Sequence, residues 1–156
     1  MPTHEDFMRR AIALSRRKLA LGERPFGAVV VRDGQIIGEG SAQQVSTNDP
    51  TAHAEITAIR QAAHALGTND LSGCTIYTSC EPCPMCTAVI WYTGIDATYY
   101  ANVRTDFNMS GRDTASVVEQ TCAPLDRRKR PHIRLLAAEA YQVLEDWQEM
   151  LAKQAP

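Results

Sequence analysis

The sequence predicts an α/β protein, a three-layer α/β/α sandwich around a mixed five-stranded sheet. Segments with helical periodicity alternate with short β-branched, apolar segments, which is the pattern of a sheet covered by helices. An Asp33-Gly34 turn joins the first two predicted strands into an antiparallel hairpin, so the sheet is not purely parallel. A length of 156 residues fits one domain, residues 1–156, with a sizeable core.

The first elements are predicted from periodicity, capping and turn residues. Residues 4–21 carry apolar side chains at helical spacing, and Thr3 begins a capping-box pattern. Residues 26–32 are mostly β-branched and apolar, as in a buried strand, and residues 35–40 return antiparallel after the Asp33-Gly34 turn.

The rest of the chain continues the alternation of helices and strands. Asp49 and Thr51 stand before the second helix and are candidates to cap it. Pro84 suits the first turn of the third helix, because proline lacks the N–H that has no helical partner there. The predicted helices cover residues 53–66, 82–93 and 140–153, with a short one near 113–120, and the predicted strands cover residues 74–79, 97–101 and 133–136.

Composition and charge narrow the class of protein. The net charge of −2 gives no general attraction to phosphate polymers, so nucleic acid is not an expected partner. No apolar run has the length of a membrane span, and no secretory leader begins the chain, so we expect a cytoplasmic protein without membrane contact. The odd count of five cysteines argues against a disulfide framework.

Two short motifs predict a catalytic zinc site. His53-Ala54-Glu55 is a His-x-Glu motif, and Pro82-Cys83-Pro84-Met85-Cys86 is a Pro-Cys-x-x-Cys motif some thirty residues later. One imidazole (His53) and two thiolates (Cys83, Cys86) make three Zn²⁺ ligands, which leaves the fourth tetrahedral position to water. The two motifs in this order are the signature of zinc deaminases, in which the glutamate is not a ligand.

The same motifs assign a reaction. Zinc lowers the pKa of its bound water and so creates a nucleophile near neutral pH. Glu55 is the predicted catalytic residue, which takes that proton and passes protons to the ring nitrogen and the leaving amine. The chemistry is hydrolytic removal of ammonia from a ring carbon that bears an amine.

The chain resembles bacterial guanine deaminases, within the cytidine-deaminase-like superfamily. The resemblance is carried by residues 25–29 (Pro-Phe-Gly-Ala-Val), 48–55 (Asn-Asp-Pro-Thr-Ala-His-Ala-Glu) and 78–86 (Thr-Ser-Cys-Glu-Pro-Cys-Pro-Met-Cys). It implies deamination of a free nucleobase, guanine to xanthine plus ammonia, with Phe26 against the base. It also implies a homodimer, in some members with a C-terminal segment, here about residues 137–156, exchanged to close the partner's site.

The walls of the site must choose the substrate, because the zinc chemistry acts on any aminated ring. We expect five substrate-binding residues: Phe26, Gln43, Gln44, Tyr92 and Asp113. Ala42 stands where the resembling enzymes usually carry an asparagine that binds the base, and Thr114 follows Asp113 where they tend to carry a second acid. Asp113 can pair with an amidine-like N–H edge or cap the short helix after it.

Three other functions fit the motifs. One is a deaminase of another ring, such as a nucleoside, a cytosine-like base or a triazine. A second is a tRNA adenosine deaminase, which the basic run Arg127-Arg128-Lys129-Arg130 favours and the negative net charge opposes. The third is a non-enzymatic zinc module, in which Cys80 closes the site as a fourth ligand; Glu55 argues against it, since a structural site needs no proton carrier.

Overall fold

The computed structural model describes residues 1–106 and 114–154, with the side chain of residue 114 left out. The chain divides into two compact units, Met1–Thr114 and Ala115–Pro156. The first unit contains the sheet and both zinc-binding motifs, so it positions the site. No helix within the described residues is long and apolar enough to cross a membrane.

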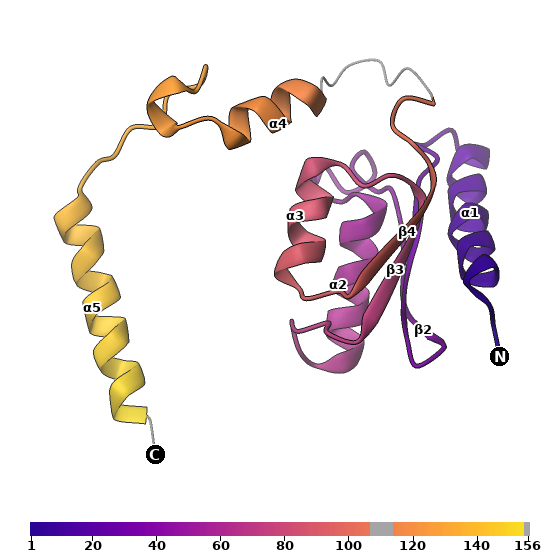
Figure 1. Cartoon of the computed structure of the whole chain (residues 1–156), viewed down its shortest axis with the longest axis horizontal. Helices are drawn as coiled ribbons and strands as arrows, with labels where there is room; N and C mark the ends of the chain where they lie inside the picture. Colours follow the sequence, from indigo (N-terminus) through magenta and orange to yellow (C-terminus); the bar gives the residue numbers. More distant parts are fainter. Residues whose placement is uncertain (107–113, 155–156) are drawn as a thin grey trace. The chain divides into compact units, whose positions relative to one another are not determined.

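The sheet of the first unit is mixed, and the hairpin lies at one edge (Figure 1). Its strands follow the order β2-β1-β3-β4. The central strand β1 is antiparallel to both neighbours, whereas β3 and β4 run parallel. The predicted hairpin is confirmed, with Asp33 and Gly34 both at positive φ in its turn. The strand bounds are Gly27–Arg32 (β1), Gln35–Ser41 (β2), Cys74–Cys80 (β3) and Ala97–Asn102 (β4).

The prediction of a fifth strand over residues 133–136 was wrong, because the sheet of the described chain has four strands. Residues 131–135 have no regular structure. Pro131 has no N–H to donate to a ladder, and Leu136 adopts a φ of 52°, which ends an extended run. A β-branched, apolar sequence gives a strand only where a neighbouring strand is available to pair with it.

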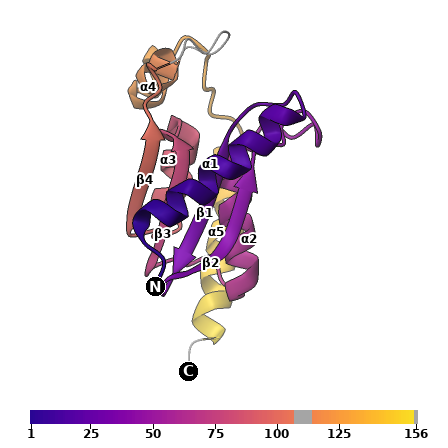
Figure 2. The ribbon, with the colours of Figure 1, turned by 90° about the vertical axis from the view of Figure 1, so that its right-hand side faces the viewer.

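Helices cover both faces of this sheet, as predicted (Figure 2). Helix α1 (His4–Ala20) packs on one face, where Phe7 and Leu14 contact Val29 and Tyr77. Helices α2 (Ala54–Leu66) and α3 (Pro84–Tyr92) lie on the opposite face, over the alternate strand residues such as Val30. The capping box expected at Thr3 is present.

Small residues let α2 lie unusually close to β2. Gly40 faces the backbone of Ala54 and Ala58, and a Cβ atom added at Gly40 would collide with both. Any larger residue at Gly40 must therefore push α2 away from the sheet. Because α2 begins directly after His53, this close contact also sets the distance between the His53 segment and the sheet.

The second unit is helical within its described residues. It contains α4 (Thr114–Cys122) except for the first residue of that helix, a short 3₁₀ helix (Leu125–Arg127) and α5 (Ala137–Gln154). The helices predicted near 113–120 and over 140–153 are therefore confirmed, each with somewhat different bounds. No residue of α5 is buried in this chain, although its apolar side chains recur at helical spacing.

Candidate metal centre and active site

His53 lies at the start of α2 and not within it. It is the N-cap residue, with extended backbone angles (φ −68°, ψ 159°), and the helix begins at Ala54. Its backbone is fixed on both sides: its N–H donates to the Thr51 carbonyl at 2.7 Å, and its carbonyl accepts from the Thr57 hydroxyl at 2.9 Å. Two residues two apart cannot share one face of a regular helix, but the extended N-cap allows His53 and Glu55 to reach one site.

The two cysteines belong to the start of α3. Cys83 is the N-cap, and Pro84 lies in the first turn as predicted, where it is the first helical residue. Cys86 follows within the same turn with no exposed surface. The loop from the end of β3 through Pro82 delivers this helix start to the same edge of the sheet as the start of α2. The sequence order of two helices that each follow a sheet connection thus brings the motifs together.

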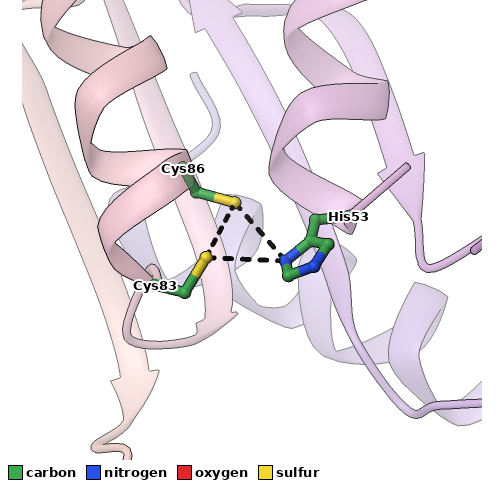
Figure 3. A group of neighbouring side chains, drawn as sticks. All are labelled: His53, Cys83 and Cys86. Atoms are coloured by element: carbon green, nitrogen blue, oxygen red, sulfur yellow. Dashed lines mark hydrogen bonds between the residues drawn. The ribbon is translucent and has the colours of Figure 1, made fainter. Parts of the chain in front are cut away.

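The three predicted ligand side chains meet in the structure (Figure 3). His53 Nδ1 lies 3.6 Å from Cys83 Sγ and 3.6 Å from Cys86 Sγ, and the two sulfur atoms lie 3.6 Å apart. A tetrahedral zinc with Zn–S bonds of about 2.3 Å and Zn–N bonds of about 2.0 Å separates its ligand atoms by roughly 3.5–3.8 Å. The donor set and its spacing therefore fit Zn²⁺.

Cys80 does not belong to this cluster. It is buried at the end of β3, and burial raises the pKa of its thiol to about 11. Within the described residues, His53, Cys83 and Cys86 form the one group with metal-binding spacing. A site with three protein ligands leaves a position for a reactant, which is the arrangement of catalytic zinc.

The electrostatics of the site suit a cation. The hydrogen bond between the two sulfur atoms lowers the pKa of Cys83 to about 4, although burial opposes this, and the same bond raises the pKa of Cys86. A metal ion that binds both sulfurs takes them as thiolates and displaces the thiol protons. Glu55 is buried beside them, and that burial raises the pKa of its carboxyl group.

Phe26 and Gln43 lie on neighbouring segments near the start of α2. The Ala42 N–H donates to the Phe26 carbonyl at 3.1 Å, and the Gln43 N–H donates to the Ala52 carbonyl at 2.9 Å, directly before His53. Phe26 packs against the core on the α2 side of the sheet, and Ala42 is buried. Gln44 lines a pocket of about 310 Å³ together with Arg24, Val45, Asn48 and Pro50.

Tyr92 is not brought to the cluster. It is the last residue of α3, 88% exposed, and its Cα lies about 9 Å along the helix axis from that of Cys86. Periodicity places a residue on a helix but does not tell which end faces a site. Asp113 lies outside the described residues, so its predicted contact with the substrate stays a prediction.

Asp49 and Thr51 are not the cap of α2, contrary to the expectation from the sequence, because His53 is the N-cap residue and its side chain makes no cap hydrogen bond. Instead the Asp49 carboxylate accepts bonds from the Thr51 N–H at 2.8 Å and from its hydroxyl at 2.6 Å. Arg60, which sequence reasoning missed, completes this arrangement. Its one sequence signal is its place seven residues after His53, two turns along the same side of a helix.

Comparison with known proteins gives the same assignment. Residues 1–102 match the family model of the cytidine and deoxycytidylate deaminase zinc-binding region. The chain is 40% identical to the guanine deaminase of Bacillus subtilis over 96% of this chain and 97% of that protein. The crystal structure of that enzyme matches with a TM-score of 0.88 over 95% of both chains.

Two further relatives are more distant. A structure of guanine deaminase from Nitrosomonas europaea is 30% identical, with a TM-score of 0.65 over 72% of this chain and 69% of the other. A tRNA-specific adenosine deaminase of Aquifex aeolicus is 36% identical over 62% of this chain and 64% of its own length. With a three-ligand cluster of zinc spacing and a family model that spans both ligand motifs, the chain belongs to the cytidine and deoxycytidylate deaminase family of zinc enzymes.

Proposed function

We propose that this protein deaminates a free nucleobase by hydrolysis, and that guanine is the base, converted to xanthine and ammonia. One observation carries the proposal: a buried glutamate adjoins a three-ligand zinc cluster in a chain 40% identical, nearly end to end, to a guanine deaminase. A structural zinc site has four protein ligands and no need of a buried acid.

In this proposal His53 Nδ1 and the sulfur atoms of Cys83 and Cys86 hold the zinc ion. When bound, zinc acidifies a water molecule and polarises it for attack. Glu55 moves two protons in turn: its carboxylate takes one from the attacking water and gives it to the ring nitrogen, then takes the second from the hydroxyl added to the ring carbon and gives it to the departing amine, which leaves as ammonia. The raised pKa of the Glu55 carboxyl suits this exchange, because a group that titrates nearer neutrality both accepts and releases a proton readily.

We assign recognition of the ring to Phe26, Gln43, Gln44 and Asp113. Phe26 offers an aromatic face, and the buried Ala42 offers no side-chain hydrogen bond. Gln43 directly follows that position and carries a polar amide, and its backbone is held next to the His53 segment. Asp113 supplies an acceptor for the N–H edge of guanine.

A second candidate, deamination of adenosine in tRNA, is favoured by relatives of that function and by the basic run 127–130. Part of that run is engaged within the second unit. The Arg128 guanidinium donates to the carbonyls of Thr121 and Ala123, each at 3.1 Å, and Lys129 lies 3.9 Å from Glu119. We therefore rank RNA below a free base.

A substrate panel tests the proposal. Ammonia release is measured with guanine, cytosine, a diaminotriazine, guanosine, cytidine and a tRNA anticodon stem-loop, in wild-type protein and in Ala42→Asn and Asp113→Ala. We expect the highest kcat/KM for guanine and a fall of about tenfold or more in Asp113→Ala, because a site built to pair with a polar edge discriminates strongly. Guanine left untouched while another ring reacts efficiently would replace the proposed substrate with that ring.

We also propose a homodimer, in which residues 137–156 of one subunit cover the site of the other. Apolar side chains are exposed on both units. On α5 they include Leu144 and Trp147, and on the first unit they include Trp91, Tyr92 and Tyr100. Surfaces of this kind mark protein interfaces.

The thiolate ligands and five free cysteines fit a reducing compartment, so we place the enzyme in the cytoplasm.

The dimer is tested by sedimentation equilibrium. The wild-type chain is expected to sediment as a dimer, and Trp147→Glu is expected to weaken the dimer at least tenfold, because a charge replaces a large apolar contact. Gln148→Glu is the matched control, since it adds the same charge one residue further along α5. A monomeric wild type, or equal weakening in both variants, contradicts the proposed interface.

A further inference from the structure

Both segments that carry the zinc ligands contain a carboxylate held by an arginine from elsewhere in the fold. We define the Asp49 clamp as Asp49, Thr51 and Arg60, and the Glu81 clamp as Glu81 and Arg104. Asp49 stands four residues before His53, and Glu81 stands two residues before Cys83. We propose that Arg60 and Arg104 are positioning residues for the zinc ligands, acting through these two clamps.

The Asp49 clamp is a closed ring of hydrogen bonds around the segment that leads to His53. One Asp49 oxygen accepts both bonds from Thr51, and the other accepts from Arg60 Nη1 at 3.2 Å. Arg60 Nη2 donates to the Thr51 hydroxyl at 3.1 Å. The ring reaches the metal ligand directly, because the Thr51 carbonyl accepts the His53 N–H.

The Asp49 clamp also ties the loop to the helix that follows it. Arg60 belongs to α2, two turns after His53, whereas Asp49 and Thr51 precede the helix. The two hydrogen bonds of Arg60 thus link the helix to its entry segment. The direction in which the His53 ring leaves the backbone is thereby coupled to the rigid helix.

The Glu81 clamp does the same for the cysteine segment. Glu81 Oε1 accepts from Arg104 Nη2 at 2.9 Å, and Oε2 accepts from the Arg104 backbone N–H at 3.1 Å. The Glu81 N–H in turn donates to the Asn102 carbonyl at 2.7 Å, at the end of β4. The short segment between the end of β3 and Cys83 is therefore attached, through Glu81, to the end of the parallel neighbour strand.

Neither clamp is placed to contribute much to global stability. The side chains are 56% and 35% exposed in the Arg60–Asp49 pair and 35% and 30% exposed in the Arg104–Glu81 pair. Exposed ion pairs contribute little to unfolding free energy, because water screens them. Their effect is local: they restrict the two segments whose side chains must converge on one ion, and outer groups that orient ligands matter for metal affinity.

The test compares three arginine variants of the full chain, Arg60→Gln, Arg104→Gln and Arg10→Gln. Arg10 is the matched control, because it makes a two-pronged pair with Glu39 at 2.7 Å, similarly exposed, between α1 and β2, where no ligand lies. Zinc affinity is measured by competition with a chelating dye, and urea unfolding of the zinc-free proteins is measured in parallel. Neither readout needs a substrate.

We expect Arg60→Gln and Arg104→Gln each to weaken zinc binding about tenfold, at the low end of the ~10–100-fold attributed to such outer groups. Arg10→Gln should bind zinc as the wild type does, and the three unfolding midpoints should agree. Arg60→Lys should recover part of the loss, because lysine keeps the charge but not the two-pronged geometry.

Zinc affinity that is equal in all three variants overturns the proposal. So does a larger fall of the unfolding midpoint in Arg60→Gln and Arg104→Gln than in Arg10→Gln, because that result indicates a general structural role. The proposal rests on the ligand set of the proposed function. Wild-type protein that binds no zinc refutes that ligand set, whereas normal zinc binding in wild type and variants refutes only the positioning role.

Discussion

Replacing Glu55 by glutamine is expected to lower kcat on the true substrate by at least ~10²-fold and up to ~10⁴-fold, the range attributed to general acid–base catalysis. Glutamine has the shape of glutamate and cannot accept and return a proton. The carboxyl group of Glu55 is buried beside Cys86. The ligand cluster found among the described residues contains no carboxylate, so none of the three ligands can take over the proton transfer of Glu55. Single-turnover kinetics on guanine and on the best alternative substrate measures the effect.

The zinc content of Glu55→Gln separates catalysis from metal binding. Because Glu55 is not among the three ligand side chains, the variant should retain one zinc per chain. Its fold should also persist, since a neutral amide is less costly to bury than a carboxylate. Wild-type turnover in this variant would remove Glu55 from the mechanism, and loss of zinc would make it part of the metal site.

Replacing Cys86 by alanine is expected to abolish zinc retention and, with it, deamination. The variant removes one of three protein ligands, so the loss of affinity should exceed the ~10–100-fold seen for groups outside the ligand shell. Cys86 has no exposed surface, so an exposed side chain nearby cannot take the place of its thiolate as a zinc ligand. Metal analysis after dialysis and chelator competition measure the result.

Cys80→Ala is the matched control for Cys86→Ala. It removes one buried thiol from the same stretch of chain, but from a residue outside the ligand cluster. It should therefore keep its zinc and most of its turnover. If Cys80→Ala also released the metal, Cys80 would count as a fourth ligand, and the closed four-ligand module would regain support.

The sequence by itself determined the chemistry, because metal chemistry depends on residue types and spacing. His53, Glu55, Cys83 and Cys86 could be singled out for this reason, and the structure brings the three ligands together. Local elements were also predictable: the Asp33-Gly34 turn needs positive φ, and Pro84 fits only the first turn of a helix. Each of these local signals is contained within a few consecutive residues.

Only the tertiary structure decided what depends on distant partners. Residues 133–136 have the composition of a strand, but pairing, which composition does not specify, is absent, so the sheet has four strands. Tyr92 was placed on the correct helix, but only the structure shows that it is the exposed last residue of α3, six residues after Cys86. Arg104 meets Glu81 because β4 lies parallel to β3, so a contact across 23 residues depends on the order of strands in the sheet and has no sequence signature.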